Sequence, residues 1–289
     1  MSYNVWGGGA NKDKPVDETV AAIEAADADI VGIQESRLEG SPCPARNCPP
    51  RGDSVAAEIA AELGWEYYEQ TIENEALWAN AILSRYPIGE PTPNDTGVEI
   101  DVDGRSVSMF NVHLSDYPYQ PHQLLDIDYG RAPTVATAEE AIAAAEAARG
   151  AAIDLLVEDM EAVEGANATF VTGDFNEPSG LDWTVEAADG YQPAAVDWPS
   201  TRALTDLGFV DTYREIWPDP VAKPAFTWTP TGNPAGRFDH HDRIDFVLAK
   251  GEDLTFSDAA IVGERGPSTD LAVDPWPSDH RASLAVVEF

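Results

Sequence analysis

The run Gly173-Asp174-Phe175-Asn176 has the residue types and spacing best suited to chemistry. It directly follows the apolar run Ala168 to Val171, which has the length and composition of a buried strand. A strand that ends in Gly-Asp-x-Asn brings a carboxylate and an amide to the carboxyl end of a sheet, where α/β folds gather their reactive groups. Gly-Asp-x-Asn is also common turn chemistry, so this run alone does not assign a function.

Other polar side chains also follow apolar, strand-like runs along the chain. They are Asn4, Gln34-Glu35, Asn111-Val112-His113, Arg243-Ile244-Asp245 and Ser278-Asp279-His280. Taken singly, a glutamate after a strand is usually a solvated cap, and a histidine there is more often structural. We expect His122 and His240 to be structural for that reason. The whole set, each member after an apolar run, is improbable by chance even in an acid-rich chain.

A metal site is the first chemistry that these residues suggest. Glu35 ends a predicted buried strand, and a hard ion such as Mg²⁺ takes one or two protein carboxylates together with waters and substrate oxygens. Asn4 can join such a site without adding charge. Asp279 is a second candidate contact for the metal.

Acid–base catalysis and phosphate binding are the second kind of chemistry that these residues suggest. Asp174 and Asn176 alternate around Phe175, so their side chains point the same way, one suited to orienting a water and one to holding a phosphoryl oxygen. His113 and His280 are donors suited to a developing negative charge. Asp245 is a candidate to hold one of these histidines in a fixed tautomer.

Periodicity and turn residues predict the elements that must position these groups. We expect strands over 2–6, 29–33, 79–83, 244–248 and 283–289, a hairpin of 97–102 with 106–112 across Asp103-Gly104, and helices over 16–26, 54–63, 137–163 and 201–207. Strands mixed with helices and hairpins favour an α/β sandwich over a purely parallel sheet. With no linker, repeat or apolar membrane-spanning run in the sequence, we expect one domain, residues 1–289, and a monomer.

The charge is extreme, with 52 acidic and 17 basic residues and a formal net charge of −35. The acidic residues are spread through every segment, so the charge is a property of the whole surface. A surface of this kind repels itself at low salt, and we infer adaptation to high salt. The same charge removes the basic-patch argument for nucleic-acid binding without excluding a nucleic-acid substrate.

The two cysteines, Cys43 and Cys48, lie in a proline-rich loop without a nearby histidine, which disfavours zinc. A local disulfide is preferred slightly over two free thiols. A disulfide would favour an extracellular protein and free thiols a cytoplasmic one, so localisation stays open. Met1 to Trp6 resembles the second half of a strand, which leaves open whether the natural chain starts upstream of Met1.

On these residues the chain resembles the endonuclease/exonuclease/phosphatase superfamily, also called deoxyribonuclease-like. The matching runs follow the family's order over nearly the whole chain: 2–6, 33–35, 81–88, 111–114, 173–176, 242–246 and 278–280. The resemblance implies a four-layer sandwich in which two mixed β-sheets pack face to face with helices outside. It also implies metal-dependent phosphoester hydrolysis with Mg²⁺ or Mn²⁺.

The resemblance also implies roles, carried over position by position. Glu35 resembles the principal metal ligand, with Asn4 and Asp279 completing or adjoining the site. Asp174 resembles the residue that activates or orients water, and Asn176 the one that holds the phosphate. His280, paired with Asp245, and His113 resemble the two histidines that face the phosphate. Which histidine acts as acid and which as base stays open.

Trp6 departs from the family's abasic-site endonucleases, which carry Asp at this position, so a DNA-repair function is disfavoured. The elaborated loop 114–124 lies beside His113 in sequence, and Asp116, Tyr119 and His241 are candidate substrate contacts. Trp183 and Trp228 are candidates for the same substrate pocket, and packing of the loop explains them at least as well.

We therefore expect a phosphodiesterase that acts on nucleic acid, a phospholipid or a small phosphodiester. The alternatives are a phosphomonoesterase and a non-catalytic binding domain that kept the fold.

Overall fold

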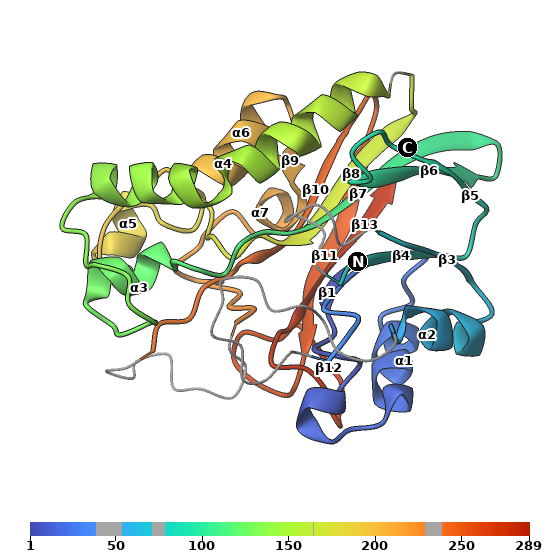
Figure 1. The fold of residues 1–289 in the computed structure, drawn as a ribbon, viewed down its shortest axis with the longest axis horizontal. Coiled ribbons are helices and arrows are strands. Elements are labelled where there is room, and N and C mark those ends of the chain that lie inside the picture. The colour runs from blue at the N-terminus through green and yellow to red at the C-terminus, as the bar shows by residue number, and fades with distance from the viewer. Residues whose placement is uncertain (39–53, 71–78, 164, 229–238) are drawn as a thin grey trace.

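The computed structural model describes residues 1–38, 54–70, 79–163, 165–228 and 239–289. Two mixed β-sheets pack face to face, and helices cover the outer face of each (Figure 1). This is the four-layer sandwich that the family resemblance implied, and that prediction is confirmed. Cys43 and Cys48 lie outside the described residues, so the disulfide stays a prediction.

Within the described residues the first sheet has seven strands in the order β12-β11-β13-β1-β2-β4-β3. Their bounds are β1 Ser2–Asn4, β2 Ile30–Gln34, β3 Glu66–Glu69, β4 Ala81–Ser84, β11 Thr255–Gly263, β12 Leu271–Ala272 and β13 Ala282–Glu288. The second sheet has six strands in the order β5-β6-β7-β8-β10-β9. Their bounds are β5 Ile88–Pro91, β6 Gly97–Val102, β7 Arg105–His113, β8 Ala168–Asp174, β9 Val210–Asp211 and β10 Asp245–Gly251.

The helices belong to different layers. Their bounds are α1 Val16–Ala25, α2 Ala56–Leu63, α3 Gln120–Leu125, α4 Ala138–Ala162, α5 Val185–Ala188, α6 Pro199–Asp206 and α7 Thr212–Ile216, with a 3₁₀ turn at Ala10–Lys12. In Figure 1, α1 and α2 lie below the sheets, and α4 and α6 lie above them. Among the described helices, none is both long and apolar enough to cross a bilayer.

Alternation along the strands gives each sheet two different faces. On β1 and β2, Tyr3, Val31 and Ile33 pack against Ile23 of α1 and Ile59 of α2. On the second sheet the outward residues pack against α4 and α6 in a separate cluster that includes Phe110, Val171, Phe246, Leu156 and Leu204. The outer layers are therefore ordinary hydrophobic cores.

The layer between the sheets is partly polar. Asn111 on β7 donates through Nδ2 to the carbonyl of Ile33 at 2.9 Å and accepts at Oδ1 from Gln34 Nε2 at 2.6 Å. Thr172 on β8 donates to Asn111 Oδ1 at 3.1 Å, and Gly173 N–H donates to Ser2 Oγ at 3.0 Å. Buried polar groups require such partners, so this network fixes the position of one sheet relative to the other.

Strand direction brings distant residues to one edge of the sandwich. β1 is parallel to β2, and β7 is parallel to β8, whereas β10 is antiparallel to β8 and β13 is antiparallel to β1. The carboxyl ends of β1, β2, β7 and β8 therefore lie beside the amino ends of β10 and β13. This edge carries the residues singled out in the sequence.

Replacing Gly32 tests the close approach of the sheets. A Cβ atom there would lie 2.0 Å from Thr172 Oγ1 and 2.5 Å from Asn111 Oδ1, so Gly32→Ala must push the sheets apart. We expect the free energy of unfolding in urea to fall by about 3 kcal/mol, because overpacked cores are strained. The matched control is Gly150→Ala within α4, where a Cβ meets nothing within 4 Å and a gain of about 1 kcal/mol is expected. Equal stability of the two variants would contradict this picture.

Candidate active site

The candidate site continues the polar layer between the sheets. Two positions along a strand return to the same face, so three of the network residues are followed, two positions later, by a site residue at the sheet edge. Three strands repeat this step: Ser2 to Asn4, Asn111 to His113, and Thr172 to Asp174. The hydrogen-bond network between the sheets therefore lies next to the site, on the inner side, and holds the strands that carry the site residues.

Asp174 lies where the two sheets meet at this edge. Its Oδ2 accepts a hydrogen bond from Asn4 Nδ2 at 3.0 Å and lies 3.6 Å from Nε2 of both His113 and His280. The Asn4 Nδ2 group also donates to Glu35 Oε1 at 2.9 Å. Groups from distant parts of the chain thus converge on one carboxylate, which is 1% exposed.

Glu35 reaches this cluster because the chain turns sharply after β2. Its backbone has φ 53°, in the left-handed region that side chains other than glycine rarely adopt. Its carbonyl accepts from Gly7 N–H at 2.8 Å, which stabilises the turn. Asn176 and Trp6, also at this edge, have φ 47°. Strained residues of this kind persist where the surrounding structure fixes them, commonly at functional sites.

His280 and Asp245 form a buried pair, with Nδ1 of the imidazole 3.0 Å from Asp245 Oδ2. Burial opposes the charged form of His280, but the carboxylates of Asp245 and Asp174 outweigh it and raise the pKa of His280 well above its ordinary value. Burial raises the pKa of Asp245 to about 6 although His280 opposes the shift. The pair is therefore held as imidazolium and carboxylate at neutral pH, with Nε2 turned toward Asp174.

Asn176 and Asp279 lie at the border of the cluster. Asn176 N–H donates to Asp174 Oδ1 at 2.9 Å, and its side-chain Nδ2 donates to the Leu114 carbonyl at 3.0 Å. The Oδ1 atom of Asp279 is buried and has no hydrogen-bond partner among the described residues. Burial raises the pKa of Asp279, while His280 and Lys12 oppose this shift.

The structure thus brings together Asn4, Glu35, His113, Asp174, Asp245 and His280, with Asn176 and Asp279 beside them. Asp116, Tyr119 and His241 lie in other surroundings. Asp116 is exposed and accepts a hydrogen bond from Tyr129 at 3.3 Å. Tyr119 and His241 are each 2% exposed, and they bond to Asp242 Oδ2 at 2.6 Å and Asp239 Oδ2 at 2.9 Å respectively.

Two residues that position the site were given no role at the sequence level: Ser278 was noted only as part of the Ser278-Asp279-His280 run, and Thr227 was not singled out. Ser278 Oγ donates to the Asn4 carbonyl at 2.7 Å and accepts from His280 N–H at 3.0 Å, which ties the His280 turn to β1. Thr227 Oγ1 accepts from Asp245 N–H at 3.2 Å. The Ser-x-His spacing was a usable signal, because serine often bonds to the backbone two residues ahead. Thr227 lies in a different segment and gave no such signal.

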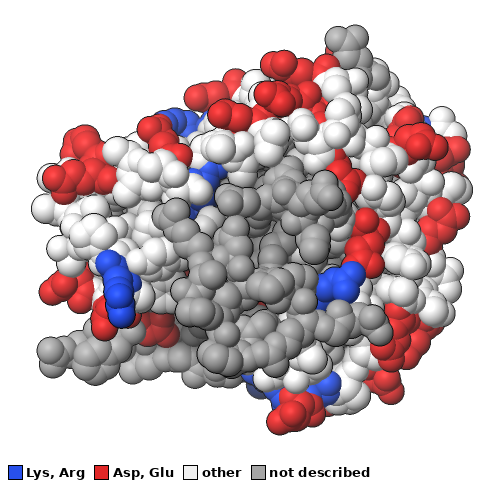
Figure 2. Space-filling view, viewed as in Figure 1, with Lys and Arg blue, Asp and Glu red and all other residues white. Residues whose placement is uncertain are grey.

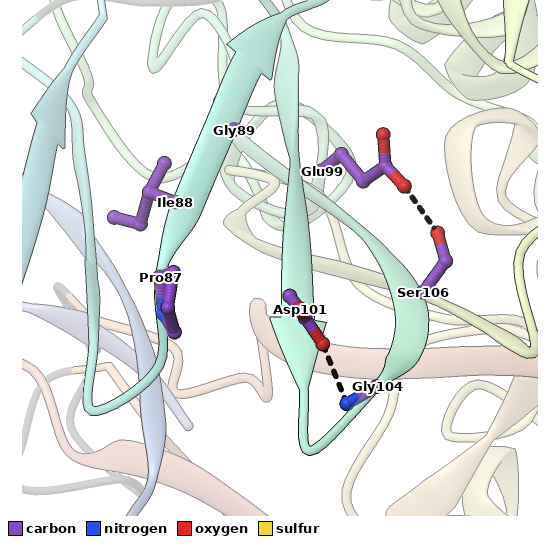
Figure 3. Close-up of a pocket in the computed structure, with 7 residues that line it drawn as sticks. All are labelled: Pro87, Ile88, Gly89, Glu99, Asp101, Gly104 and Ser106. Atoms are coloured by element: carbon purple, nitrogen blue, oxygen red, sulfur yellow. Dashed lines mark hydrogen bonds between the residues drawn. The ribbon is translucent and has the colours of Figure 1, made fainter.

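A surface hollow of about 330 Å³ lies elsewhere, over β5, β6 and β7. Its two carboxylates already accept from the chain, Glu99 from Ser106 Oγ at 2.7 Å and Asp101 from Gly104 N–H at 2.6 Å (Figure 3). None of the predicted site residues lines it. The hollow is therefore separate from the candidate site at the Asp174 edge.

Solved structures with the same architecture cover nearly all of the chain. The 3′ phosphatase NExo from Neisseria, bound to a product DNA hairpin, has TM-score 0.56 and 17% identity over 100% of this chain and 98% of that chain. TDP2 from D. rerio, complexed with a single-strand DNA product, has TM-score 0.55 and 11% identity over 100% and 97%. An AP endonuclease from Archaeoglobus fulgidus has TM-score 0.53 and 15% identity over 100% and 98%.

Among curated proteins, the uncharacterized protein F14F9.5 of Caenorhabditis elegans is 33% identical over 98 residues, which are 32% of this chain and 31% of that protein. A family model gives the broader assignment, since it matches residues 1–280. With the sandwich fold and the converging carboxylates and histidines, this match makes the chain a member of the endonuclease/exonuclease/phosphatase family.

Proposed function

We propose that this protein is a divalent-metal-dependent hydrolase of phosphate diesters. The observation that carries the proposal is the convergence on Asp174 Oδ2, where one amide and two imidazole nitrogens lie within 3.6 Å. A carboxylate among hydrogen-bond donors can take a proton from water while the donors face negative charge on phosphorus. Family membership supports hydrolysis of a phosphoester.

The donor set fits a hard divalent ion. One ligand atom from each of Glu35, His113 and Asp174 lies within 4.8 Å of the others. Carboxylate oxygens are the ligands that Mg²⁺ and Mn²⁺ prefer, so Glu35 would be the principal ligand, with Asn4 and the buried Asp279 Oδ1 adjoining. When bound, such an ion would supply positive charge to the phosphoryl oxygens.

The protein's own groups have complementary proposed roles. Asp174 orients the attacking water and receives its proton. His280 faces the phosphate as an imidazolium that Asp245 holds in place, and His113 faces it from β7. Asn176 has one side-chain N–H bonded to Leu114, which leaves its other N–H for a phosphoryl oxygen.

Hydrolysis of bis-p-nitrophenyl phosphate, compared with p-nitrophenyl phosphate in the presence and absence of a chelator, tests the proposal. We expect the diester to be hydrolysed faster, the chelator to abolish the activity and Mg²⁺ or Mn²⁺ to restore it. Glu35→Gln should raise the metal concentration required for half-maximal rate by about tenfold or more, as loss of a ligand weakens the site. A chelator-resistant rate would overturn the metal requirement.

A phosphomonoesterase is the second candidate, since a structural neighbour is described as a 3′ phosphatase. Faster hydrolysis of the monoester would favour it. If neither ester were hydrolysed, and wild-type protein were indistinguishable from Asp174→Ala, the result would favour a binding domain.

The natural diester is a nucleic acid, a phospholipid or a small molecule. Two structural neighbours are described with bound DNA products, which favours nucleic acid. The formal charge of −35 works against it, because a polyanion approaches an acidic surface poorly without metal or salt. Assays on DNA, RNA and sphingomyelin in molar salt would separate these classes.

We also propose adaptation to high salt. Asp and Glu side chains surround the face in Figure 2, and Lys and Arg appear at few positions. We expect the Tm to rise by on the order of 10 °C between about 0.1 M and about 2 M NaCl, because the Debye length falls to about 3 Å at 1 M. Sodium chloride is preferred to sulfate, which stabilises proteins generally by exclusion from their surface. A Tm that did not depend on NaCl would refute the adaptation.

A further inference from the structure

A series of aromatic rings extends from His280 through Trp228 to α3 and the segment that follows α3. The Trp228 ring centroid lies 6.4 Å from that of His280 and 6.0 Å from that of His122, with interplanar angles of 36° and 40°. Trp228 is half-buried. Its ring therefore lies between the candidate catalytic imidazole and a second imidazole that the proposed chemistry does not use.

Tyrosines complete this group on the His122 side. Tyr119 packs edge-on against His122 at 4.9 Å and Trp228 at 5.5 Å, and its hydroxyl is fixed by Asp242. Tyr129 packs edge-on against His122 at 5.6 Å and is half-buried. The result is an apolar, aromatic wall beside His280.

His122 differs from the neighbouring His240 because both of its ring nitrogens lack a hydrogen-bond partner in the part of the chain that the structure describes. It is 4% exposed, yet neither ring nitrogen has a hydrogen-bond partner among the described residues, and the carboxylate oxygen paired with it, Asp239 Oδ1, is 3.9 Å from Nε2. By contrast, His240 Nε2 pairs with Gln192 Oε1 at 2.7 Å. Burial lowers the pKa of His122, which favours the neutral ring with one donor and one acceptor nitrogen. Buried polar atoms without partners are unfavourable, and a ligand would supply the missing bonds.

We propose that Trp228, Tyr129 and His122 form a subsite for a planar aromatic group in the organic part of the phosphate ester, with His122 bonded to the polar edge of that group. The inference rests on the proposed phosphoesterase function and adds the class of substrate. Aromatic rings bind other rings by stacking whatever the ring substituents, and hydrogen bonds then select among them.

The test compares ligands that differ only in a planar ring. Phenyl phosphate is paired with cyclohexyl phosphate, and thymidine 5′-monophosphate with 2-deoxyribose 5-phosphate. Each is measured as an inhibitor of bis-p-nitrophenyl phosphate hydrolysis, and its binding to the metal-loaded protein is measured by calorimetry. We expect the planar member of each pair to bind about tenfold tighter or more. Equal binding within both pairs would overturn the subsite.

Calorimetry keeps this outcome separate from failure of the proposed function. A protein that does not hydrolyse the diester but still prefers planar rings would retain the subsite and lose the enzyme proposal. Hydrolysis without any preference for planar rings would do the opposite.

Three variants assign the roles within the subsite. Trp228→Leu should reduce the planar preference to near unity, and Tyr129→Ala, at a half-buried position, should reduce it as well. His122→Phe keeps a ring but lacks both nitrogens, so it should weaken thymidine 5′-monophosphate severalfold and leave phenyl phosphate unchanged. The control is Trp65→Leu, at a partly buried tryptophan that packs in the N-terminal core instead. Unchanged nucleotide binding by His122→Phe would refute the hydrogen-bonding role, and a loss of phenyl phosphate binding would reduce it to packing.

Discussion

Asp174→Asn is expected to lower kcat on bis-p-nitrophenyl phosphate by about 10²- to 10⁴-fold, the range for loss of a positioned acid–base group. Its Oδ2 is the atom on which Asn4, His113 and His280 converge. An asparagine has nearly the same shape but cannot take a proton from water. It also presents no charge to the two imidazoles.

The loss of activity in Asp174→Asn should come from a lower kcat and not from unfolding of the protein. The amide carbonyl that the substitution introduces can still accept from Asn176 N–H, as Asp174 Oδ1 does at 2.9 Å. Removing a buried charge also relieves the repulsion between Asp174 and Asp245. The amide nitrogen that replaces Oδ2 cannot accept from Asn4 Nδ2, which offsets this gain, so we expect unfolding to stay cooperative with only a small change in Tm. Asp206→Asn, at an exposed position at the end of α6, is the matched control and should retain full activity.

A change in KM with an unchanged kcat would assign Asp174 to ground-state binding instead. Loss of both activity and cooperative unfolding would leave Asp174 with only a structural role in this fold.

Much of this site could be predicted because most of its residues lie at the ends of strands, and strand ends can be recognised in the sequence. Short apolar runs that end in polar residues predicted β1, β2, β7 and β8, and the observed ends lie within a few residues of those expected. A strand at β10 was also predicted, but Asp245 begins β10 and His280 precedes β13, so these two residues do not follow apolar strands as expected. The turn at Asp103-Gly104 was predicted as a hairpin, and both residues have positive φ, at 54° and 86°, as a two-residue turn of this type requires.

Irregular elements could not be predicted in the same way. β11 has nine residues, yet its pairing with β13 shifts between Phe256 and Asp258. A bulge of this kind interrupts the two-residue alternation by which a half-buried strand is recognised.

Hydrogen bonds between residues far apart in the chain could not be predicted from the sequence either. Asn111 was grouped with His113 as a strand-end residue, but it lies two positions inside β7 and bonds to Gln34 across the sheets. Tyr119 was singled out for its place near His113, whereas its hydroxyl is buried against Asp242, 123 residues away. Sequence gives residue type and approximate depth in a strand, but long-range packing decides the partner.

The pair His280 and Asp245 is expected to act as one unit in a double-mutant cycle. His280→Ala should lower kcat by about 10²- to 10⁴-fold, and adding Asp245→Asn should cost little more, since Asp245 acts through the imidazole that it holds at 3.0 Å. Asp245→Asn alone should also change the pH profile at fixed metal concentration. The carboxylate raises the pKa of His280, so its removal lowers that pKa, and the alkaline limb of kcat should move to lower pH. Additive losses, or an alkaline limb that stays in place, would mean that the two residues act independently. Thr205→Ala, at an exposed position on α6, controls for general effects of substitution.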